Sequence, residues 1–574
     1  MTVDSNARAA PGRDWQRAAL ALTALVLIGA LYSMRLRLLE TLTIDPDEFE
    51  HLHVAWCMAN GLVPYRDFFE HHTPWLHFLI APFFRFYAVA GDPDAAIAFI
   101  FFARRIAMVL AGVAIALTFL LARLWRGEIA GWMSAVLLST AVVFVHKTLE
   151  IRPDGLAMVL WLGALVAIVG ALGDGQVSPR RNNALFALSG FMLGGAIMST
   201  QKILVIMPSI SLAMIWYLCA GTDRLNRRVA GVLCQFGGFC VALGATVAYF
   251  WAHGALRAFV EDNLILNLEW QSSFPRYFFV LQRFCENPVL MTLGAIGLVR
   301  EIPATFRKLT FNADKLLMLA TVGAMSGVYL LPEPWPQYYL TFVPLLCLYA
   351  AALLVFVAGK ISGADRTASL PVEIAYAIAL GLLCCSAIAL SPIQVPHSAP
   401  VAFGVLLLAG IIVLFRAPVA GLVLLLIAFS VHPYQQMRMQ FGETTDAIQL
   451  RKLRYVLSNT RPTDTVLDSW SGLGVFRPHA YFYFFVHGGI LQFISSQARQ
   501  QFAADLLSGK IAPTLMIPNE NLLELTPMLN TIMQLDYMPV PFEFPIRRRK
   551  DEPLSPLMRN LLQPPAPASP GKQP

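Results

Sequence analysis

The chain alternates long apolar runs with short polar segments. A transmembrane helix needs about 20 predominantly apolar residues to cross the hydrocarbon core of a bilayer. By this measure the sequence predicts an all-α polytopic membrane domain over residues 16–432, with about 13 spanning helices. They are expected near 16–34, 98–122, 129–145, 154–172, 184–199, 203–220, 229–251, 289–299, 316–331, 337–358, 372–391, 400–415 and 418–432.

Basic residues are concentrated in alternate loops between these runs. The first set comprises Arg8, Arg13, Arg17, Arg123, Arg126, Arg180, Arg181, Arg224, Arg227, Arg228, Arg300, Arg307, Lys308, Lys315, Lys360, Arg366 and Arg416. The intervening short loops carry only Lys147, Arg152 and Lys202. Because cytoplasmic loops of membrane proteins carry an excess of Lys and Arg, we expect a cytoplasmic N-terminal tail at 1–15 and, with an odd number of spans, an external C-terminus.

Three segments are therefore expected outside. The first external loop covers 35–97 and should contain interfacial helices, and a second large loop covers 252–288. Residues 433–562 are more soluble in character and predict a small α/β domain. Its expected elements are strands at 465–467 and 514–517 and helices near 478–486, 496–508 and 519–533. The Pro-rich segment 563–574 predicts disorder.

Composition supports a membrane protein and excludes several other classes. Of 574 residues, 57% are hydrophobic and 14% are charged, with a mean hydropathy of +0.58, which is far from the values of soluble globular proteins. The net charge of +7 lies in membrane-flanking loops, so no nucleic-acid partner is expected. The cysteines are scattered and mostly apolar in context, which predicts neither a disulfide framework nor a metal site. Arg outnumbers Lys by 34 to 9 and no N-x-S/T site occurs, which indicates a bacterial protein.

The densest group of ionisable residues directly follows the first span. Asp45 is placed to cap a helix, with Pro46 at its first position and Glu48 completing a capping box. This helix should be interfacial, with its apolar stripe in the headgroup zone and with Asp47, Glu50 and His51 on the opposite, polar side. Capping alone explains Asp45. It explains Asp47 less well, because a second carboxylate there adds little to the cap, so Asp47 is the stronger functional candidate.

Two more polar groups are expected on the outer side. Glu70, His71 and His72 could bind a metal, although consecutive residues are weak ligand spacing, and a contact to an anionic headgroup or a structural role is the alternative. In the loop between spans three and four, Glu150 and Asp154 form a second acidic cluster, where Asp154 could also serve only as a helix cap. We expect the two acidic clusters to share one cleft.

These residues resemble the GT-C superfamily of integral-membrane glycosyltransferases, in particular the branch of dolichyl-phosphate-mannose protein mannosyltransferases and the bacterial aminoarabinose lipid A transferase. The resemblance rests on the external Asp47-Glu48 pair, the His72-Thr73-Pro74-Trp75 turn, an Arg before the second span (Arg104 or Arg105), Asp154 in Arg-Pro-Asp-Gly, and the Gln-Tyr-Tyr-Leu stretch beginning at Gln337. The Lys of the family's K-P-P turn is replaced by His72 here, so another residue could take over its phosphate contact.

The resemblance implies a polyprenyl-phosphate sugar donor, undecaprenyl phosphate in a bacterium, and transfer with inversion to a hydroxyl of a lipid, glycolipid or protein acceptor at the periplasmic face of the inner membrane. By this analogy Asp47 is the general base, and Glu48 and Asp154 orient the base or the acceptor. Expected contacts to the donor phosphate are His72, His71, Lys202, Arg105 and Arg276. Expected acceptor or sugar contacts are Glu50, His51, Glu150, Gln337 and Tyr338, where Tyr338 could instead belong to an interfacial aromatic belt. No cofactor is assigned, and a divalent metal is an open possibility.

Other functions remain to be weighed. A secondary transporter would place ionisable residues near the bilayer midplane, between related halves of the chain. Here the spans are nearly free of charge, and no internal repeat is visible. A lipid-linked polysaccharide polymerase or ligase also works at the outer face and is closer in kind. A non-catalytic scaffold would not need the acidic clusters.

Overall fold

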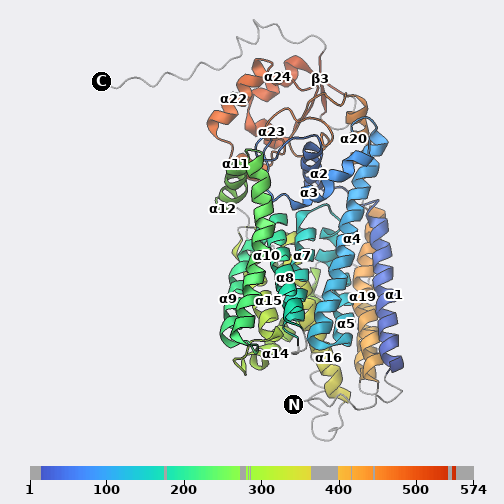
Figure 1. Ribbon diagram of the computed structural model, residues 1–574. Helices are drawn as coiled ribbons and strands as arrows, with labels where there is room; N and C mark the ends of the chain where they lie inside the picture. The colour runs from blue at the N-terminus through green and yellow to red at the C-terminus, as the bar shows by residue number, and fades with distance from the viewer. Residues whose placement is uncertain are drawn as a thin grey trace.

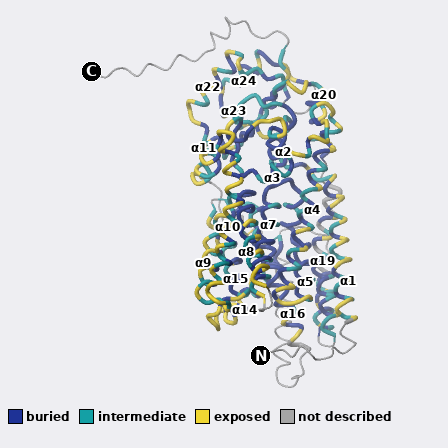
Figure 2. The backbone as a smooth tube through the Cα atoms, viewed as in Figure 1, coloured by how far each residue is buried: buried dark blue, intermediate teal, exposed yellow. Residues whose placement is uncertain are grey.

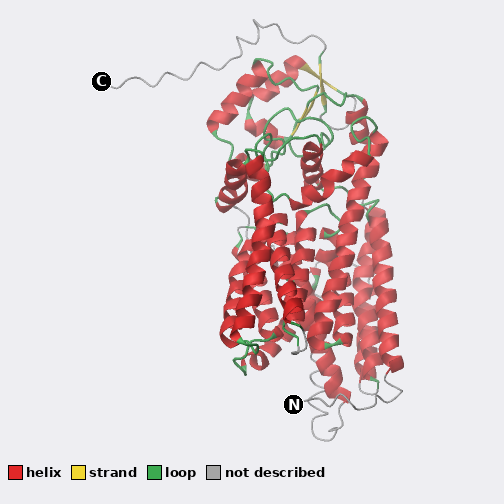
Figure 3. Ribbon diagram, viewed as in Figure 1, coloured by secondary structure: helices red, strands yellow, loops and turns green. Residues whose placement is uncertain are grey.

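The protein is a long helical bundle with a smaller mixed region at one end (Figure 1). The computed structural model describes residues 14–173, 178–271, 280–281, 284, 286–331, 333–362, 398–414, 417–443, 446–540 and 546–550. Arg276, the expected span at 372–391 and the Pro-rich segment 563–574 lie outside these residues. Within the described residues, helices make up the bundle and strands occur only in the mixed region (Figure 3).

The bundle is built from the helices that the apolar runs predict. They are α1 (Asp14–Leu38), α4 (Pro93–Arg126), α5 (Glu128–Thr140), α6 (Val142–Lys147), α7 (Pro153–Ala171), α8 (Pro179–Ser199), η2 (Gln201–Ile206), α9 (Met207–Ala220), α10 (Leu225–Ala252), α14 (Pro288–Phe306), α15 (Ala313–Leu330), η4 (Pro336–Thr341), α16 (Val343–Ser362), α18 (Ser398–Leu414) and α19 (Pro418–Glu443). Each expected span within the described residues thus coincides with a helix.

Eight of the described helices are long and apolar enough to cross a membrane, and this makes the chain an integral membrane protein. The expected count of 13 also included α5, α8, α16 and α18, which are helical but shorter or more polar. The short run at 289–299 forms a full-length helix, α14, because its ends extend through less apolar residues. In contrast, the run at 129–145 is broken at Ala141, where the backbone becomes extended.

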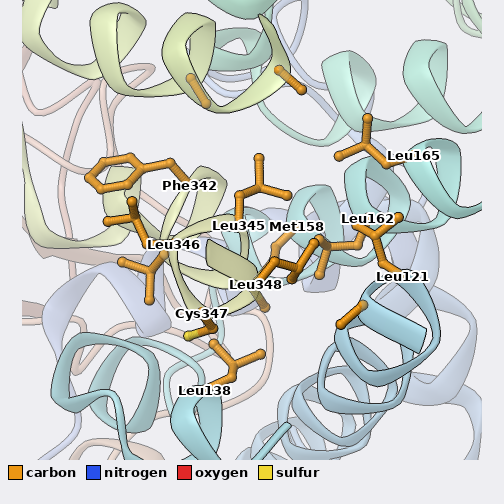
Figure 4. Packing of buried hydrophobic residues seen from close by; sticks show 14 of the residues in the cluster. Leu121, Leu138, Met158, Leu162, Leu165, Phe342, Leu345, Leu346, Cys347 and Leu348 are labelled. Carbon is orange, nitrogen blue, oxygen red and sulfur yellow. The ribbon is translucent and has the colours of Figure 1, made fainter. Parts of the chain in front are cut away.

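The interior of the bundle is a continuous apolar core contributed by α4, α5, α7 and α16, among others (Figure 4). Figure 2 shows the buried interior and the exposed outer faces, which in a membrane would contact lipid. Small residues let helices approach closely, as is common between membrane helices. A Cβ atom on Gly190 of α8 would lie 1.7 Å from the backbone oxygen of Gln235 in α10, and one on Gly238 would lie 2.0 Å from the oxygen of Ala187.

The first external loop folds over one end of the bundle. It contains α2 (Pro46–Ala59), α3 (Trp75–Ile80) and the 3-10 helix η1 (Ala81–Phe86). Phe49, Leu52 and Trp56 of α2 are buried in one core together with residues of the C-terminal region. The expected contact of this apolar stripe with lipid headgroups is therefore wrong, because the C-terminal region covers the helix.

The C-terminal region comprises α20 (Ala447–Ser458), α21 (Gly488–Leu491), α22 (Ser496–Leu507), α23 (Glu520–Leu525), α24 (Met528–Asp536) and a four-stranded sheet. The strands are β1 (Val466–Asp468), β2 (Leu515–Ile517), β3 (Tyr537–Pro539) and β4 (Arg547–Arg549), in the order β1-β2-β4-β3. β1 and β2 are parallel, and β4 is antiparallel to both β2 and β3. The small α/β character and both expected strands are confirmed.

Two details of this region differ from the expectation. Residues 478–486 are not helical: His479 bridges to Val466, and the carbonyl of Phe482 accepts a hydrogen bond from the amide of Phe69, so the aromatic side chains pack from a loop. The stretch 519–533 is split into α23 and α24 at Thr526-Pro527, because proline lacks the amide hydrogen that a continuous helix requires.

The two ends of the bundle differ in charge. At the end remote from the C-terminal region, Arg126 after α4 pairs with Glu301 and Asp314, which flank the loop between α14 and α15. This contact places two of the arginine-rich loops at the same end, as the charge pattern requires. The first external loop and the C-terminal region occupy the opposite end (Figure 1).

Candidate active site

The amino end of α2 positions the first carboxylates. Asp45 caps the helix by accepting a hydrogen bond from the amide of Asp47 at 3.0 Å, and Glu48 accepts one from the amide of Asp45 at 3.0 Å. The predicted capping box is therefore present. Asp47, one residue after Pro46, contributes only its amide to the cap, and its side chain remains one-third exposed. Its carboxylate therefore takes no part in the helix cap.

Arg152, directly before α7, joins the two acidic clusters. Its guanidinium contacts Asp47 at 2.7 Å and Asp45 at 3.0 Å, and it also donates to Glu150. Lys147 approaches the same Glu150 at 2.7 Å. The loops that carry the two acidic clusters thus meet at one buried arginine, as the shared cleft required.

Glu48 has a different environment from its neighbour Asp47. Its side chain is fully buried and forms two contacts with Arg104 of α4, at 2.6 and 2.9 Å, and it accepts the amide of Ile151 at 3.1 Å. Arg104 also donates to the carbonyls of Leu39 and Leu42. Glu48 therefore positions the amino end of α2 against α4 and has no surface left for a substrate.

A third group is the ion pair of Asp154, near the start of α7, and Lys202, near the start of η2. Lys202 approaches Asp154 at 3.5 Å, and its ammonium lies 4.1 Å from the ring centre of Tyr338 in η4. Gln337 is buried next to Tyr338 in the chain. Lys202 is only slightly exposed and has one carboxylate partner, in contrast to Arg152 with three, so it is the better placed of the two to bind an added anion.

Two histidines and two glutamates form the fourth group. The Nδ1 atom of His72 lies 2.9 Å from Glu70, and Glu70 accepts the backbone amides of His71 and His72. Glu50 of α2 lies 3.8 and 3.9 Å from the Nδ1 atoms of His71 and His72. One ligand atom from each of the four residues lies within 4.8 Å of the others, and one oxygen of Glu70 is buried without a hydrogen-bond partner. Such a set of imidazoles and carboxylates suits a divalent metal. The sequence suggested three of these ligands, and Glu50 is added by the fold.

The C-terminal region covers this group. The ring of His487, which caps α21, lies 6.2 Å from the ring of His71, and Trp270 of the second external loop lies 6.0 Å from it. The carbonyl of His71 accepts hydrogen bonds from Gln201 and Asn267. Three segments far apart in the sequence therefore enclose the turn that carries the two histidines.

Burial and neighbouring charges set the protonation states. Burial alone would raise the pKa of Asp47, but the charge and hydrogen bond of Arg152 lower it to about 2. Burial raises the pKa of Glu50 well above its usual value, and the nearby Glu70 and Asp47 carboxylates raise it further. Burial lowers the pKa of His72 to about 3, with the charge of Lys202 adding to the effect. His72 is therefore a neutral hydrogen-bonding group at physiological pH.

One cavity lies away from these groups. Its volume is about 620 Å³, and it is lined at the carboxyl end of α2 and along η1 by Trp56, Phe84, Tyr87 and other apolar residues, with Arg85 as its charged residue. The acidic groups lie near the other end of α2. This cavity can bind an apolar group, but it does not contain the ionisable cluster.

Most of the predicted site residues are brought together. His51 belongs to the group as well, with its Nδ1 atom 3.3 Å from Nε2 of His77 and its ring 4.8 Å from the ring of His72. Arg105 does not: it pairs with the exposed Glu40 on the surface, one helix position away from the buried Arg104. The sequence reasoning missed Arg152 as the central cation. One signal could have pointed to Arg152. It lies in Arg-Pro-Asp-Gly, on the side of the membrane where basic residues are rare.

The predicted resemblance to the GT-C superfamily is confirmed by one family model and by the fold of solved structures. Residues 71–250 match the sequence model of a family described as dolichyl-phosphate-mannose-protein mannosyltransferase. This match begins at His71 and covers the turn with the two histidines, Arg152, Asp154 and Lys202. No curated protein matches the chain in sequence.

Solved structures with the same fold include ArnT from Cupriavidus metallidurans. The apo form has a TM-score of 0.62 at 13% identity, and a form bound to undecaprenyl phosphate has 0.57 at 14%; each alignment covers 92% of this chain and 97% of the other. The apo oligosaccharyltransferase of Archaeoglobus fulgidus has a TM-score of 0.53 at 13% identity, over 88% of this chain and 70% of that one. At these identities the likeness concerns the fold.

Proposed function

We propose that the protein is a membrane glycosyltransferase that moves a sugar from a polyprenyl-phosphate donor to an acceptor hydroxyl, with inversion at the anomeric carbon. The observation that carries this proposal is Asp47, an ionised and partly exposed carboxylate fixed by Arg152 close to the pair of Lys202 and Asp154. The family match and the undecaprenyl phosphate bound to ArnT support the lipid-phosphate donor.

In this mechanism Asp47 takes the proton of the acceptor hydroxyl. A carboxylate with a pKa of about 2 is a weak base, so it removes the proton late, after the bond between sugar and phosphate has largely broken and the attacking hydroxyl has become acidic. Arg152 fixes the carboxylate in position, and Glu48 fixes the helix that carries it. Asp154 holds the Lys202 ammonium in the cleft.

The departing phosphate needs positive charge or hydrogen-bond donors. Lys202 supplies the charge, and neutral His71 can supply a ring N–H group, whereas the ring hydrogen of neutral His72 is donated to Glu70. The local charge balance is unfavourable for an anion, because among the described residues of the site the carboxyl groups of Asp45, Asp47, Glu48, Glu70, Glu150 and Asp154 outnumber the cations Lys147, Arg104, Arg152 and Lys202. A divalent cation held by Glu50, Glu70, His71 and His72 would offset this excess and neutralise the phosphate. Glu150 is occupied by Arg152 and Lys147, so it supports the site, while His51 and the η4 residues Gln337 and Tyr338 remain for the sugar or acceptor.

The proposed location is the bacterial inner membrane, with the site and the C-terminal region on the periplasmic side. A secondary transporter is a weaker candidate, because the carboxylates of the site belong to α2 and its partner loop, and α2 packs beneath the C-terminal region and is not one of the spanning helices. A polymerase or ligase of lipid-linked polysaccharides would use the same end and differs in its donor.

The decisive experiment compares the glycolipids and envelope glycans of a deletion strain with those of the wild type by mass spectrometry. We expect one sugar-bearing product to disappear and a monosaccharide-bearing polyprenyl phosphate to accumulate. Expression of the wild-type chain should restore the product, and expression of Lys202→Met should not. Accumulation of a lipid-linked oligosaccharide would favour a polymerase or ligase, and unchanged profiles would contradict the proposal.

A further inference from the structure

A second group of metal-binding side chains lies outside the proposed active site. His53 and Cys57 are one turn apart on α2, and His479 follows β1 and Arg477 in the C-terminal region. Nε2 of His53 lies 2.8 Å from Nδ1 of His479, and the Cys57 sulfur lies 3.5 Å from the first nitrogen and 3.9 Å from the second. The three atoms thus converge on one point between two segments that are more than 400 residues apart in sequence.

The tautomer of His53 is fixed by its other nitrogen. Nδ1 of His53 lies 2.8 Å from the carbonyl oxygen of Val475, an oxygen that can only accept, so Nδ1 carries the hydrogen. Nε2 therefore presents a lone pair toward Cys57 and His479. Donation of the far ring N–H to a backbone carbonyl is the arrangement that orients metal-binding histidines in proteins.

The spacing fits a small tetrahedral ion. With metal–nitrogen bonds of about 2.0–2.1 Å and a metal–sulfur bond of about 2.3 Å, the edges of a tetrahedron are about 3.3 Å between nitrogens and about 3.6 Å between nitrogen and sulfur. The two observed sulfur–nitrogen distances bracket the latter value. The nitrogen–nitrogen distance is about half an ångström short of the former, which a small rotation of the His479 ring corrects.

The surroundings also favour an ion. His53 and Cys57 are buried and His479 is partly buried, and burial favours the neutral imidazole that binds a metal. A cavity of about 30 Å³ borders His53 and His479, with Asp468 and Ser469 in its wall. This volume holds about one water molecule, which can supply a fourth ligand.

We propose that His53, Cys57 and His479 bind one zinc ion, which joins helix α2 to the C-terminal region. A thiolate with two imidazoles is a ligand set that zinc prefers over magnesium or calcium. Binding converts the Cys57 thiol to a thiolate and releases its proton. Because α2 also carries Asp47 and Glu50 at its other end, the ion would fix the orientation of the helix on which the acidic site depends. This proposal is independent of the reaction proposed above.

The first test measures metal in the full-length protein purified in detergent without chelators, and then replaces it with cobalt(II). A cobalt–thiolate bond gives a charge-transfer band in the near ultraviolet that imidazole and carboxylate ligands do not give. Glu50, Glu70, His71 and His72 contain no thiol, so the band distinguishes the Cys57 group from that group of ligands. We expect zinc in the purified protein, and the band on cobalt loading. Absence of the band in the wild-type protein, or copper in place of zinc, would overturn the proposal without any variant.

Variants then locate the site. Cys57→Ser and His479→Ala should each remove the band and lower the bound zinc by one ion per chain. The matched control is Cys219→Ser, since Cys219 is an exposed cysteine of α9 at the far end of the bundle, and it should keep both. Glu70→Gln should also keep the band. A hydrogen-bonded trio without metal would instead give a purified protein without zinc and no cobalt–thiolate band.

Discussion

Replacing Asp47 with Asn tests whether this carboxylate does the chemistry, and Asp45→Asn is its matched control. Both side chains are one-third exposed and both contact Arg152, at 2.7 and 3.0 Å. Asn caps a helix as well as Asp does, so Asp45→Asn keeps the start of α2 intact. The two variants remove the same charge from the same arginine and differ only in whether the carboxylate belongs to the cap.

The expected magnitudes follow from these contacts. Removal of a general base costs about 10²–10⁴-fold in rate, or about 3–5 kcal/mol in the activation free energy. Loss of one partly exposed ion pair costs about 1 kcal/mol or less in stability, because solvent screens it and Arg152 retains Glu150 and the other aspartate. Asp47→Asn should therefore reduce turnover at least 100-fold, whereas Asp45→Asn should reduce it less than 10-fold. Both variants should unfold within a few degrees of the wild type.

The assay follows consumption of a monosaccharide-bearing polyprenyl phosphate by protein in liposomes that contain an extract of membrane acceptors. Thermal unfolding in detergent provides the measure of folding. If both variants retained turnover close to that of the wild type, Asp47 would not be the base. If Asp45→Asn were impaired as strongly as Asp47→Asn at equal stability, the charge balance around Arg152 would matter, and not a proton transfer at Asp47.

Three further predictions concern the same region. Glu48→Gln leaves Arg104 buried without a counter-charge and should lower stability by about 3–5 kcal/mol, measured as a large fall in the unfolding temperature. Lys202→Met should raise the apparent KM for the donor at least 10-fold, while Arg105→Ala, which loses only an exposed pair, should leave it unchanged. The folded-state pKa of His72, about 3, lies below its unfolded value of 6.5, so its contribution to stability is complete above pH 6.5 and is lost as the pH falls toward 3; the unfolding temperature should drop over that range, and less steeply in His72→Asn.

Local chemistry explains why much of the fold could be predicted. The capping box at Asp45 and Glu48 depends on residues three apart, and the strand at Val466 depends on a short β-branched run, so both are visible in the sequence. Pro527, which separates α23 from α24, is a local signal of the same kind. The expectation of a single helix over 519–533 overlooked it. Long apolar runs likewise gave the helices, because a lipid bilayer requires every backbone polar group to be satisfied within the segment itself.

The site was predictable in its residue types but not in its partners. Arg104 and Arg105 are adjacent, and only their positions around the helix decide that one is buried against Glu48 and the other faces the surface. Glu50 lies with the histidines because α2 packs against the turn that follows it. The spacing of these residues in the sequence does not indicate this contact. Contacts between segments depend on how the helices cross, and helix crossing depends on side-chain packing summed over the whole core.

The sequence by itself determined that the chain lies in a membrane, where along the chain most of its spanning helices lie, and that carboxylates gather in two loops on one side. These features follow from hydropathy, capping and charge bias, which act over one turn or one span. Only the tertiary structure decided that Arg152 joins the two loops, that the C-terminal region encloses α2, and that His53 meets His479. Such contacts join residues that are hundreds of positions apart, and their geometry arises only when the separate segments are packed into one core.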